Sequence, residues 1–433
     1  MSTSIQHLHA RRIWDSRGRP TLEVDVQLSN GAIGRGVAPA GASRGSREAL
    51  ELRDGGPLLG GLDVSQAVAQ VNGPIAQALL GLDARDQAKI DHTLIALDGT
   101  PLKSRLGANA TIATSLAVLQ SAAASEHLPL WRYLAGDKTV RLPLPEIQIF
   151  GGGAHAGRRV DIQDFLVMPL GAQSFDEALV MVANVYHAAG RLMAAAGKLA
   201  GVADEGGWWP SFDSNEEALQ TLTRAIDAAG YHYDQVAISL DIAASEFGRA
   251  GSYTLGLEKH EYDSQAWLEV LLGWVNKYPI VSVEDPFAEG DTAGMQAFTN
   301  AVGQRIQVVG DDYLVTQASL VTQAIQDKAC NAVLLKPNQI GTVTETVQAM
   351  DVARAAGWGM VVSARSGETE DTAIVHLATG WDTGQLKVGS FARSERMAKW
   401  NEGLRIEEAM GGKAVFAGRQ GLPEALRVNP KNT

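Results

Sequence analysis

Six short apolar segments in the second half of the chain each end at or next to a charged residue, and helical segments separate them. Short buried strands that alternate with helices predict a parallel (β/α) barrel. One intervening segment, 264–277, places Trp267, Leu271 and Trp274 on one helical face. The expected strands with the charges that follow are 237–240 with Asp241, 280–283 with Glu284, 306–309 with Asp311, 332–335 with Lys336, 360–363 with Arg365 and 385–386 with Lys387.

The first third of the chain has a different pattern. Residues 21–28 alternate apolar and polar side chains, which predicts a strand with one wet face, and residues 64–80 and 109–125 favour helices. A glycine-rich segment, 31–45, precedes a stretch at 46–50 that favours a helix capped by Ser46. We therefore expect a smaller α+β domain over residues 1–137, with a mobile loop at 36–46, and the barrel domain over residues 138–433. A long helix is expected at 175–195 within the barrel domain.

Composition excludes several classes of function. The 433 residues carry 37 Lys and Arg against 49 Asp and Glu, a net charge of −12, which disfavours binding to nucleic acid. No apolar run reaches the roughly 18 residues that a membrane span needs, and residues 1–20 lack a secretory pattern. Cys330 is the single cysteine, so no internal disulfide can form. We expect a cytoplasmic protein that acts on a small molecule.

The charges that end the expected strands indicate a chemistry. The carboxyl ends of barrel strands meet at one face, so Asp241, Glu284 and Asp311 should converge there. Carboxylates without His or Cys suit a hard divalent cation, and Mg²⁺ is the first choice. Lys336 and Lys387 would face that cation, and a lysine with a lowered pKa can act as a base. This combination suits the removal of a proton next to a carboxylate.

Eight motifs, in order along nearly the whole chain, resemble those of the enolase family, the phosphopyruvate hydratases. They are Asp15–Gly18, Asp204–Gly207, Ser282–Pro286, Gly310–Asp312, Lys336–Thr342, Ser366–Thr372, Ala392–Arg396 and Leu404–Glu408. The resemblance implies an α/β fold, an enolase-like (β/α)8-type barrel behind a smaller N-terminal α+β domain. It also implies a Mg²⁺-dependent lyase that dehydrates 2-phosphoglycerate or a close analogue, and a homodimer or an octamer of dimers.

The resemblance also implies roles for single residues. Lys336 corresponds to the base, Lys387 to the partner of the substrate carboxylate, and Glu205 to the acid that assists departure of the hydroxide. The Mg²⁺ ligands would be Asp241, Glu284 and Asp311. The remaining expected site residues are His155 and Asp164 among the catalytic groups, and Gln163, Ser43, Arg44, Arg365 and Ser366 around the substrate.

Several positions depart from the family pattern. Ala40 stands where the family has a serine that ligates a second Mg²⁺. We therefore expect one Mg²⁺ site, and the sequence does not decide whether a second Mg²⁺ binds. Ala364 replaces a histidine beside the expected phosphate site, and Arg44 and Arg158 add positive charge to two loops. Trp208 is larger than the aromatic residue that the family has at this position. Its ring could either pack in the core or form part of the pocket wall. These changes leave two alternatives open: an enzyme of phosphonate biosynthesis that makes carboxyphosphonoenolpyruvate, and an enolase fold that lost catalysis and serves in binding.

Overall fold

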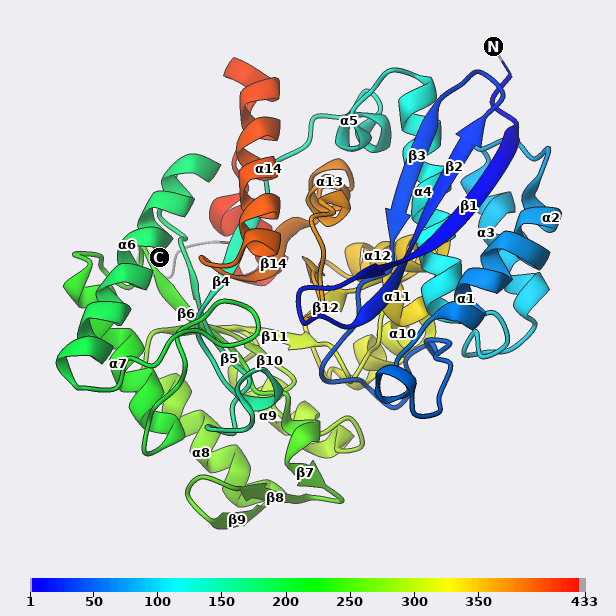
Figure 1. Ribbon diagram of the computed structural model, residues 1–433. Coiled ribbons are helices and arrows are strands. Elements are labelled where there is room, and N and C mark those ends of the chain that lie inside the picture. Colours follow the sequence, from blue (N-terminus) through cyan, green and yellow to red (C-terminus); the bar gives the residue numbers. More distant parts are fainter. Residues whose placement is uncertain (1, 428–433) are drawn as a thin grey trace.

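The computed structural model describes residues 2–427 and contains a three-stranded antiparallel sheet beside a closed eight-stranded barrel (Figure 1). The N-terminal sheet has the order β1-β2-β3, with β1 at Ile5–Trp14, β2 at Pro20–Leu28 and β3 at Ile33–Val37. The expected alternation in β2 is confirmed, because Leu22, Val24 and Val26 are fully buried. The α-helices on this side are α1 (Ser65–Gln70), α2 (Ala76–Leu79), α3 (Gln87–Asp98), α4 (Ala108–Ser125) and α5 (Leu130–Ala135).

Close packing of α4 on β3 depends on two glycines. A Cβ atom at Gly34 would lie 2.1 Å from the backbone nitrogen of Ser121, and one at Gly36 would lie 2.2 Å from the carbonyl oxygen of Ala113. Neither contact can be relieved by a side-chain rotation, because the obstructing atoms belong to the helix backbone. The glycines of this segment therefore serve helix–sheet contact as well as the loop that follows.

The barrel closes in the order β10-β11-β12-β13-β14-β4-β5-β6. Its strands are β4 (Leu144–Gly151), β5 (Asp164–Met168), β6 (Ala237–Asp241), β10 (Ile280–Glu284), β11 (Gln307–Gly310), β12 (Ala332–Leu335), β13 (Gly359–Ser363) and β14 (Gly384–Ser390). The expectation of a wholly parallel barrel was wrong, because β5 runs antiparallel to both β4 and β6. The other neighbouring pairs are parallel.

Helices cover the outside of the barrel, and two predicted helices have the expected bounds. They are α6 (Phe175–Ala195) and α8 (Ser264–Lys277), and α8 buries Trp267, Leu271 and Trp274 as its pattern predicted. The others are α7 (Asn215–Ala228), α9 (Thr292–Val302), α10 (Ala318–Asp327), α11 (Pro337–Ile340), α12 (Val343–Ala355), α13 (Ala373–Gly380) and α14 (Ser394–Met410). A small sheet of β7 (Gly248–Arg249), β8 (Ser252–Leu255) and β9 (His260–Asp263) precedes α8.

The expectation of a helix at residues 46–50 was wrong. Residues 46–50 form turns rather than a helix, and the backbone of Leu50 bonds instead to Leu102 and Ala108.

Among the described helices, α6 is long and apolar enough to cross a membrane by length and composition. Its more apolar part is 56% buried, as in the core helix of a soluble protein, so it is weak evidence for a membrane span.

Candidate active site

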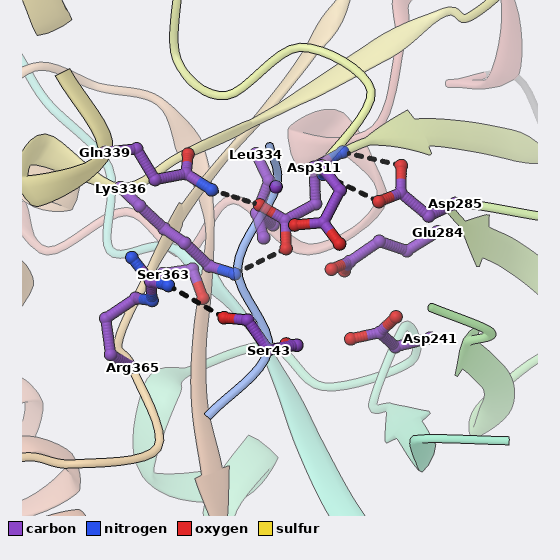
Figure 2. A network of polar contacts seen from close by, with 12 residues as sticks. Ser43, Asp241, Glu284, Asp285, Asp311, Leu334, Lys336, Gln339, Ser363 and Arg365 are labelled. Carbon is purple, nitrogen blue, oxygen red and sulfur yellow. Dashed lines mark hydrogen bonds and ion pairs between the residues drawn. The ribbon is translucent and has the colours of Figure 1, made fainter. Parts of the chain in front are cut away.

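A cavity opens at the carboxyl ends of the barrel strands, and the space inside it together with its mouth, which is open to solvent, amounts to about 320 Å³. It brings together ten of the residues expected from the sequence: Ser43, His155, Gln163, Asp164, Glu205, Asp241, Lys336, Arg365, Ser366 and Lys387. Glu284 and Asp311 do not line the cavity, but each forms an ion pair with a lysine that does. Figure 2 shows the carboxylates of Asp241, Glu284 and Asp311 near one another on one side of Lys336.

The acids are placed by strand ends, and a lysine lies between two of them. Asp241 and Glu284 are the last residues of β6 and β10 and lie side by side in register. The Nζ atom of Lys387 lies 2.8 Å from a carboxylate oxygen of each and 3.6 Å from Asp164 Oδ2. Burial, reinforced by the charge of Asp241, raises the pKa of Glu284 well above its usual value. Repulsion between the carboxylates is thus only partly relieved by the single ammonium.

Lys336, directly after β12, is paired with the third acid. Its Nζ atom lies 2.5 Å from Asp311 Oδ2, and Gln339 Nε2 donates to Asp311 Oδ1 at 2.8 Å. Burial lowers the pKa of Lys336, but the Asp311 carboxylate outweighs that effect and leaves the pKa above its usual value. The lowered pKa that a base requires is therefore not present while Asp311 is free to hold the ammonium.

Asp285 fixes the backbone of the turn that presents Asp311. Its carboxylate accepts the backbone N–H groups of Asp311 at 2.9 Å and Asp312 at 2.6 Å. Burial raises the pKa of Asp285 to about 8. The hydrogen bonds of this carboxyl group are made to backbone N–H groups of the turn. Asp285 therefore has a structural role, unlike the acids that pair with Lys336 and Lys387.

A second group of titratable side chains lines the same cavity, and its Asp164 lies close to Lys387. His155 Nε2 is 3.6 Å from Asp164 Oδ1 and 3.8 Å from Glu205 Oε1, and all three residues are buried. Burial raises the pKa of Asp164 to about 6. For Glu205, burial is outweighed by the positive charges of His155 and Arg396, which hold its pKa below the usual value. The two carboxyl groups therefore differ in pKa, so Asp164 holds a proton more readily than Glu205, as in sites that carry out acid–base chemistry.

Gln148 joins this group to the loop that carries Glu205. Its Nε2 donates to Asp164 Oδ1, and its Oε1 accepts the backbone N–H of Gly207 at 2.9 Å. The sequence analysis gave Gln148 no role. The available signal was a polar residue at every second position, Glu146 and Gln148, within an otherwise apolar strand.

Arg365 is held by the segment that follows β3. Its guanidinium lies 3.1 Å from Glu48 Oε2 and donates to Asn338 Oδ1 and the Ser43 carbonyl oxygen, both at 3.1 Å. A Cβ atom at Gly41 would lie 1.9 Å from Arg365 Nη2, so this close approach requires glycine. Glu48 was also missed by the sequence analysis, although it belongs to the same loop region as Ser43.

Ser366 lines the cavity, and the loop with Ala40 packs beside it. Ser366 Oγ accepts the backbone N–H of Ala42 at 3.2 Å, and the backbones of Ala40 and Gly367 exchange hydrogen bonds at 2.9 and 2.8 Å. The Ala40 carbonyl oxygen also accepts from Arg17 at 2.9 Å. Because that oxygen is already occupied twice, it is a poor substitute for the serine ligand that Ala40 lacks.

Arg44 and Trp208 do not line the cavity. Arg44 is exposed and donates to the Ala49 carbonyl oxygen at 3.3 Å, away from the cavity lining. Trp208 stacks on Tyr186, with 4.7 Å between ring centroids, and its indole N–H bonds to the Tyr186 carbonyl oxygen. Of the two alternatives for Trp208, the structure therefore shows packing, and Gly190 leaves the space for its ring.

Acidic clusters in the described residues could hold a cation. In two groups, one ligand atom from each residue lies within 4.8 Å of the others: His155, Asp164 and Glu205, and Asp285, Asp311 and Asp312. The expected set of Asp241, Glu284 and Asp311 is not among these groups. Its members are paired with the two lysines instead, Asp241 and Glu284 with Lys387, and Asp311 with Lys336.

The barrel and its site define a class of protein: a (β/α)8-type barrel enzyme with acid–base groups at the carboxyl ends of its strands. Comparison with known proteins gives the family. The model of the enolase C-terminal TIM barrel domain matches residues 139–424, and that of the enolase N-terminal domain matches residues 5–134. Enolase 1 of Desulfitobacterium hafniense (strain Y51) is 50% identical over 416 residues, which cover 95% of each chain. The chain belongs to the enolase family and is a carbon–oxygen lyase of the hydro-lyase type.

Proposed function

We propose that this protein is a Mg²⁺-dependent enolase that removes water from 2-phosphoglycerate. The observation that carries the proposal is the arrangement of two buried lysines paired with three buried acids, with Glu205 lining the same cavity as both lysines. A base on one side of a substrate and an acid on the other is what the elimination of water requires.

The acids fit a hard cation. Asp241, Glu284 and Asp311 offer only carboxylate oxygens, and Glu284 Oε1 is buried with no hydrogen-bond partner among residues 2–427. We propose these three as the ligands of one Mg²⁺, and the doubly occupied Ala40 carbonyl argues against a strong second site. Bound there, the ion would supply concentrated positive charge for the substrate carboxylate.

The lysines then take separate roles. A cation on Asp311 would remove the carboxylate that holds the Lys336 ammonium, so the effect of burial would prevail and lower the pKa of Lys336. Lys336 is then able to accept the proton from C2 of the substrate. Lys387 keeps its charge and contacts the substrate carboxylate, where negative charge develops.

The remaining groups bind the substrate and assist the leaving hydroxide. Glu205 gives a proton to the C3 hydroxyl, which leaves as water, and a bound anionic substrate would raise the pKa of Glu205 so that it carries this proton. His155 Nε2, at 3.8 Å from Glu205 Oε1 and 3.6 Å from Asp164 Oδ1, links the two carboxyl groups. Arg365 and Ser366 bind the phosphate, and Gln163, which donates to Asp241 Oδ2 at 3.2 Å, positions that acid. Ser43 brings a hydroxyl to the same cavity, whereas we give Arg44 no contact with the substrate.

A second candidate substrate is supported by one observation. Ala364 lines the cavity next to Arg365, and its methyl group leaves room beside the proposed phosphate site. An analogue with an additional carboxylate, as in the formation of carboxyphosphonoenolpyruvate, would use that room. A non-catalytic binding protein is disfavoured, because the three acids and both lysines are present and form ion pairs with one another at the carboxyl ends of the strands.

The family relationship supports further proposals about the whole protein. We propose a homodimer, or an octamer of dimers, in the cytoplasm, with residues 1–137 and 138–433 as its two domains. The two family models, which end at residue 134 and begin at residue 139, are compatible with that division.

The proposal is tested by following enolpyruvate formation from 2-phosphoglycerate by absorbance near 240 nm, with Mg²⁺ and with excess chelator. We expect turnover that is lost on chelation and restored by Mg²⁺. Turnover of a carboxylated phosphonate analogue at a much higher kcat/KM would favour the second substrate. Absence of activity on both substrates, with Mg²⁺ bound, would refute the enzymatic assignment.

A further inference from the structure

A carboxyl group that the proposed reaction does not use lies inside the barrel below the cavity. Glu146, on β4, is 2% exposed and does not line the cavity. Its Oε2 atom accepts a hydrogen bond from Ser239 Oγ at 3.0 Å, and its Oε1 atom has no partner among the described residues. A buried carboxylate oxygen without a partner is costly, so its presence calls for a functional explanation.

Glu146 is placed next to Lys387 and below Asp241. Strands β4 and β14 pair in register with Glu146 opposite Lys387. Ser239, which holds Glu146, precedes Asp241 by two residues on β6, so both point to the barrel interior in successive layers. Glu146 is therefore a carboxyl group one layer beneath the ammonium that pairs with Asp241 and Glu284, and above pH 7 it is an anion, because burial raises its pKa to about 7.

Charge balance makes this position significant. In this structure the Lys387 ammonium pairs with Asp241 and Glu284, each at 2.8 Å. A divalent cation on those two acids would repel the ammonium, which is buried and has few other anions to contact. Asp164, at 3.6 Å, and, above pH 7, Glu146 are the anions that remain around Lys387.

We propose that Glu146 is a positioning residue, which holds the Lys387 ammonium inside the barrel when a divalent cation takes over the acids above it. This inference rests on the proposed function, since it takes Asp241 and Glu284 as ligands of Mg²⁺. The free Oε1 atom of Glu146 provides the place for the ammonium, and Ser239 fixes the orientation of the carboxylate. Lys387 thereby stays charged and close to the substrate carboxylate rather than leaving the site.

A double-mutant cycle on metal affinity tests the proposal. Calorimetric titration with Mg²⁺, in the absence of substrate, is carried out on the unchanged protein, Glu146→Gln, Lys387→Met and the double variant. The titrations are run above pH 8, because burial raises the pKa of Glu146 to about 7. We expect Lys387→Met to bind Mg²⁺ more tightly, since the competing ammonium is gone, and Glu146→Gln to bind it more weakly.

The decisive quantity is the effect of Glu146→Gln on Mg²⁺ affinity, compared between the protein that has Lys387 and the Lys387→Met variant. If Glu146 acts through Lys387, Glu146→Gln should weaken Mg²⁺ binding by at least about threefold more when Lys387 is present than in Lys387→Met. An equal effect in both backgrounds would show that Glu146 contributes only its general charge, and no effect in either would leave it no role; both results overturn the proposal. Under saturating Mg²⁺, we also expect Glu146→Gln to raise KM more than it lowers kcat.

Two controls keep the result interpretable. Asp91→Asn removes another fully buried carboxylate, which bonds to Ser115 and Thr344 instead of any cavity residue, and it should leave Mg²⁺ affinity unchanged. If Glu146→Gln does not fold, Glu146→Leu replaces the carboxyl group by an apolar side chain and enters the same cycle. Failure of the unchanged protein to bind Mg²⁺ would refute the proposed function itself. If the protein binds Mg²⁺ but the effects of Glu146→Gln and Lys387→Met on its affinity are additive, only the role of Glu146 is refuted.

Discussion

Removal of the carboxylate that holds Arg365 gives a prediction whose size can be worked out from the structure. Glu48 and Arg365 are 3% and 4% exposed, and their closest atoms are 3.1 Å apart. Loss of one partner from a buried pair costs about 3–5 kcal/mol. Glu48→Gln keeps an acceptor oxygen, and Arg365 keeps Asn338 and Ser43 as partners, so we expect a smaller loss of about 2 kcal/mol.

The loss should be reversible by a small anion. If Arg365 is the phosphate site, inorganic phosphate can supply the negative charge that Glu48→Gln removes. Thermal unfolding is followed with and without phosphate, and we expect Glu48→Gln to lower Tm by a few degrees and phosphate to restore part of that loss. Phosphate should stabilise the unchanged protein less, because there Glu48 competes for the same guanidinium.

Glu345→Gln is the matched control for this experiment. It breaks the ion pair with buried Lys103, at 2.9 Å, outside the cavity. This variant should lose stability that phosphate does not restore. The reasoning is refuted if Glu48→Gln is as stable as the unchanged protein, or if phosphate stabilises Glu48→Gln and Glu345→Gln equally.

Three further predictions concern the metal, the substrate and pH. Glu284→Gln should weaken Mg²⁺ binding and abolish turnover, and full activity in this variant or in excess chelator would contradict the metal assignment. Ala40→Ser with Ala364→His should raise kcat/KM for 2-phosphoglycerate by on the order of 10²-fold or more, measured by steady-state kinetics; an unmodified protein that already works at ordinary enolase rates would show these positions to be neutral. Because burial raises the pKa of Glu146 to about 7, native Glu146 keeps its proton when the unfolded chain has lost it. Unfolding free energy should therefore fall from pH 5 to pH 8, by up to about 3 kcal/mol relative to Glu146→Gln, and identical pH profiles would contradict this.

The fold was predictable where a strand ends in a charge or a helix has one apolar face. Strands β6, β10 and β12 were found in this way, and the face of α8 was correct. The hairpin of β4 and β5 was missed, because both strands are buried throughout and show no alternation between buried and exposed positions, and glycines 151–153 lie between them. Antiparallel pairing of β5 leaves no mark in the local sequence.

The candidate site was predictable where side chains lie at strand ends, and it was less so in loops and inside the barrel. The acids and lysines converge because strand ends do. Arg44, in a glycine-rich loop, was expected at the substrate, but the direction of a loop side chain depends on a backbone path that the local sequence does not specify. Glu146 and Gln148 were overlooked, although two polar residues at alternate positions in a buried strand indicate a polar barrel interior.

The division of labour between Lys336 and Glu205 is the central claim, and exchange of the C2 proton of 2-phosphoglycerate with deuterium from solvent tests it most directly. Exchange requires the base alone, whereas loss of the hydroxide also requires the acid. With Mg²⁺ present, Lys336→Ala should abolish exchange while the fold and metal binding persist, and Glu205→Gln should stop elimination but leave exchange measurable by NMR. Equal loss of exchange in both variants, or exchange that survives in Lys336→Ala, would contradict the account.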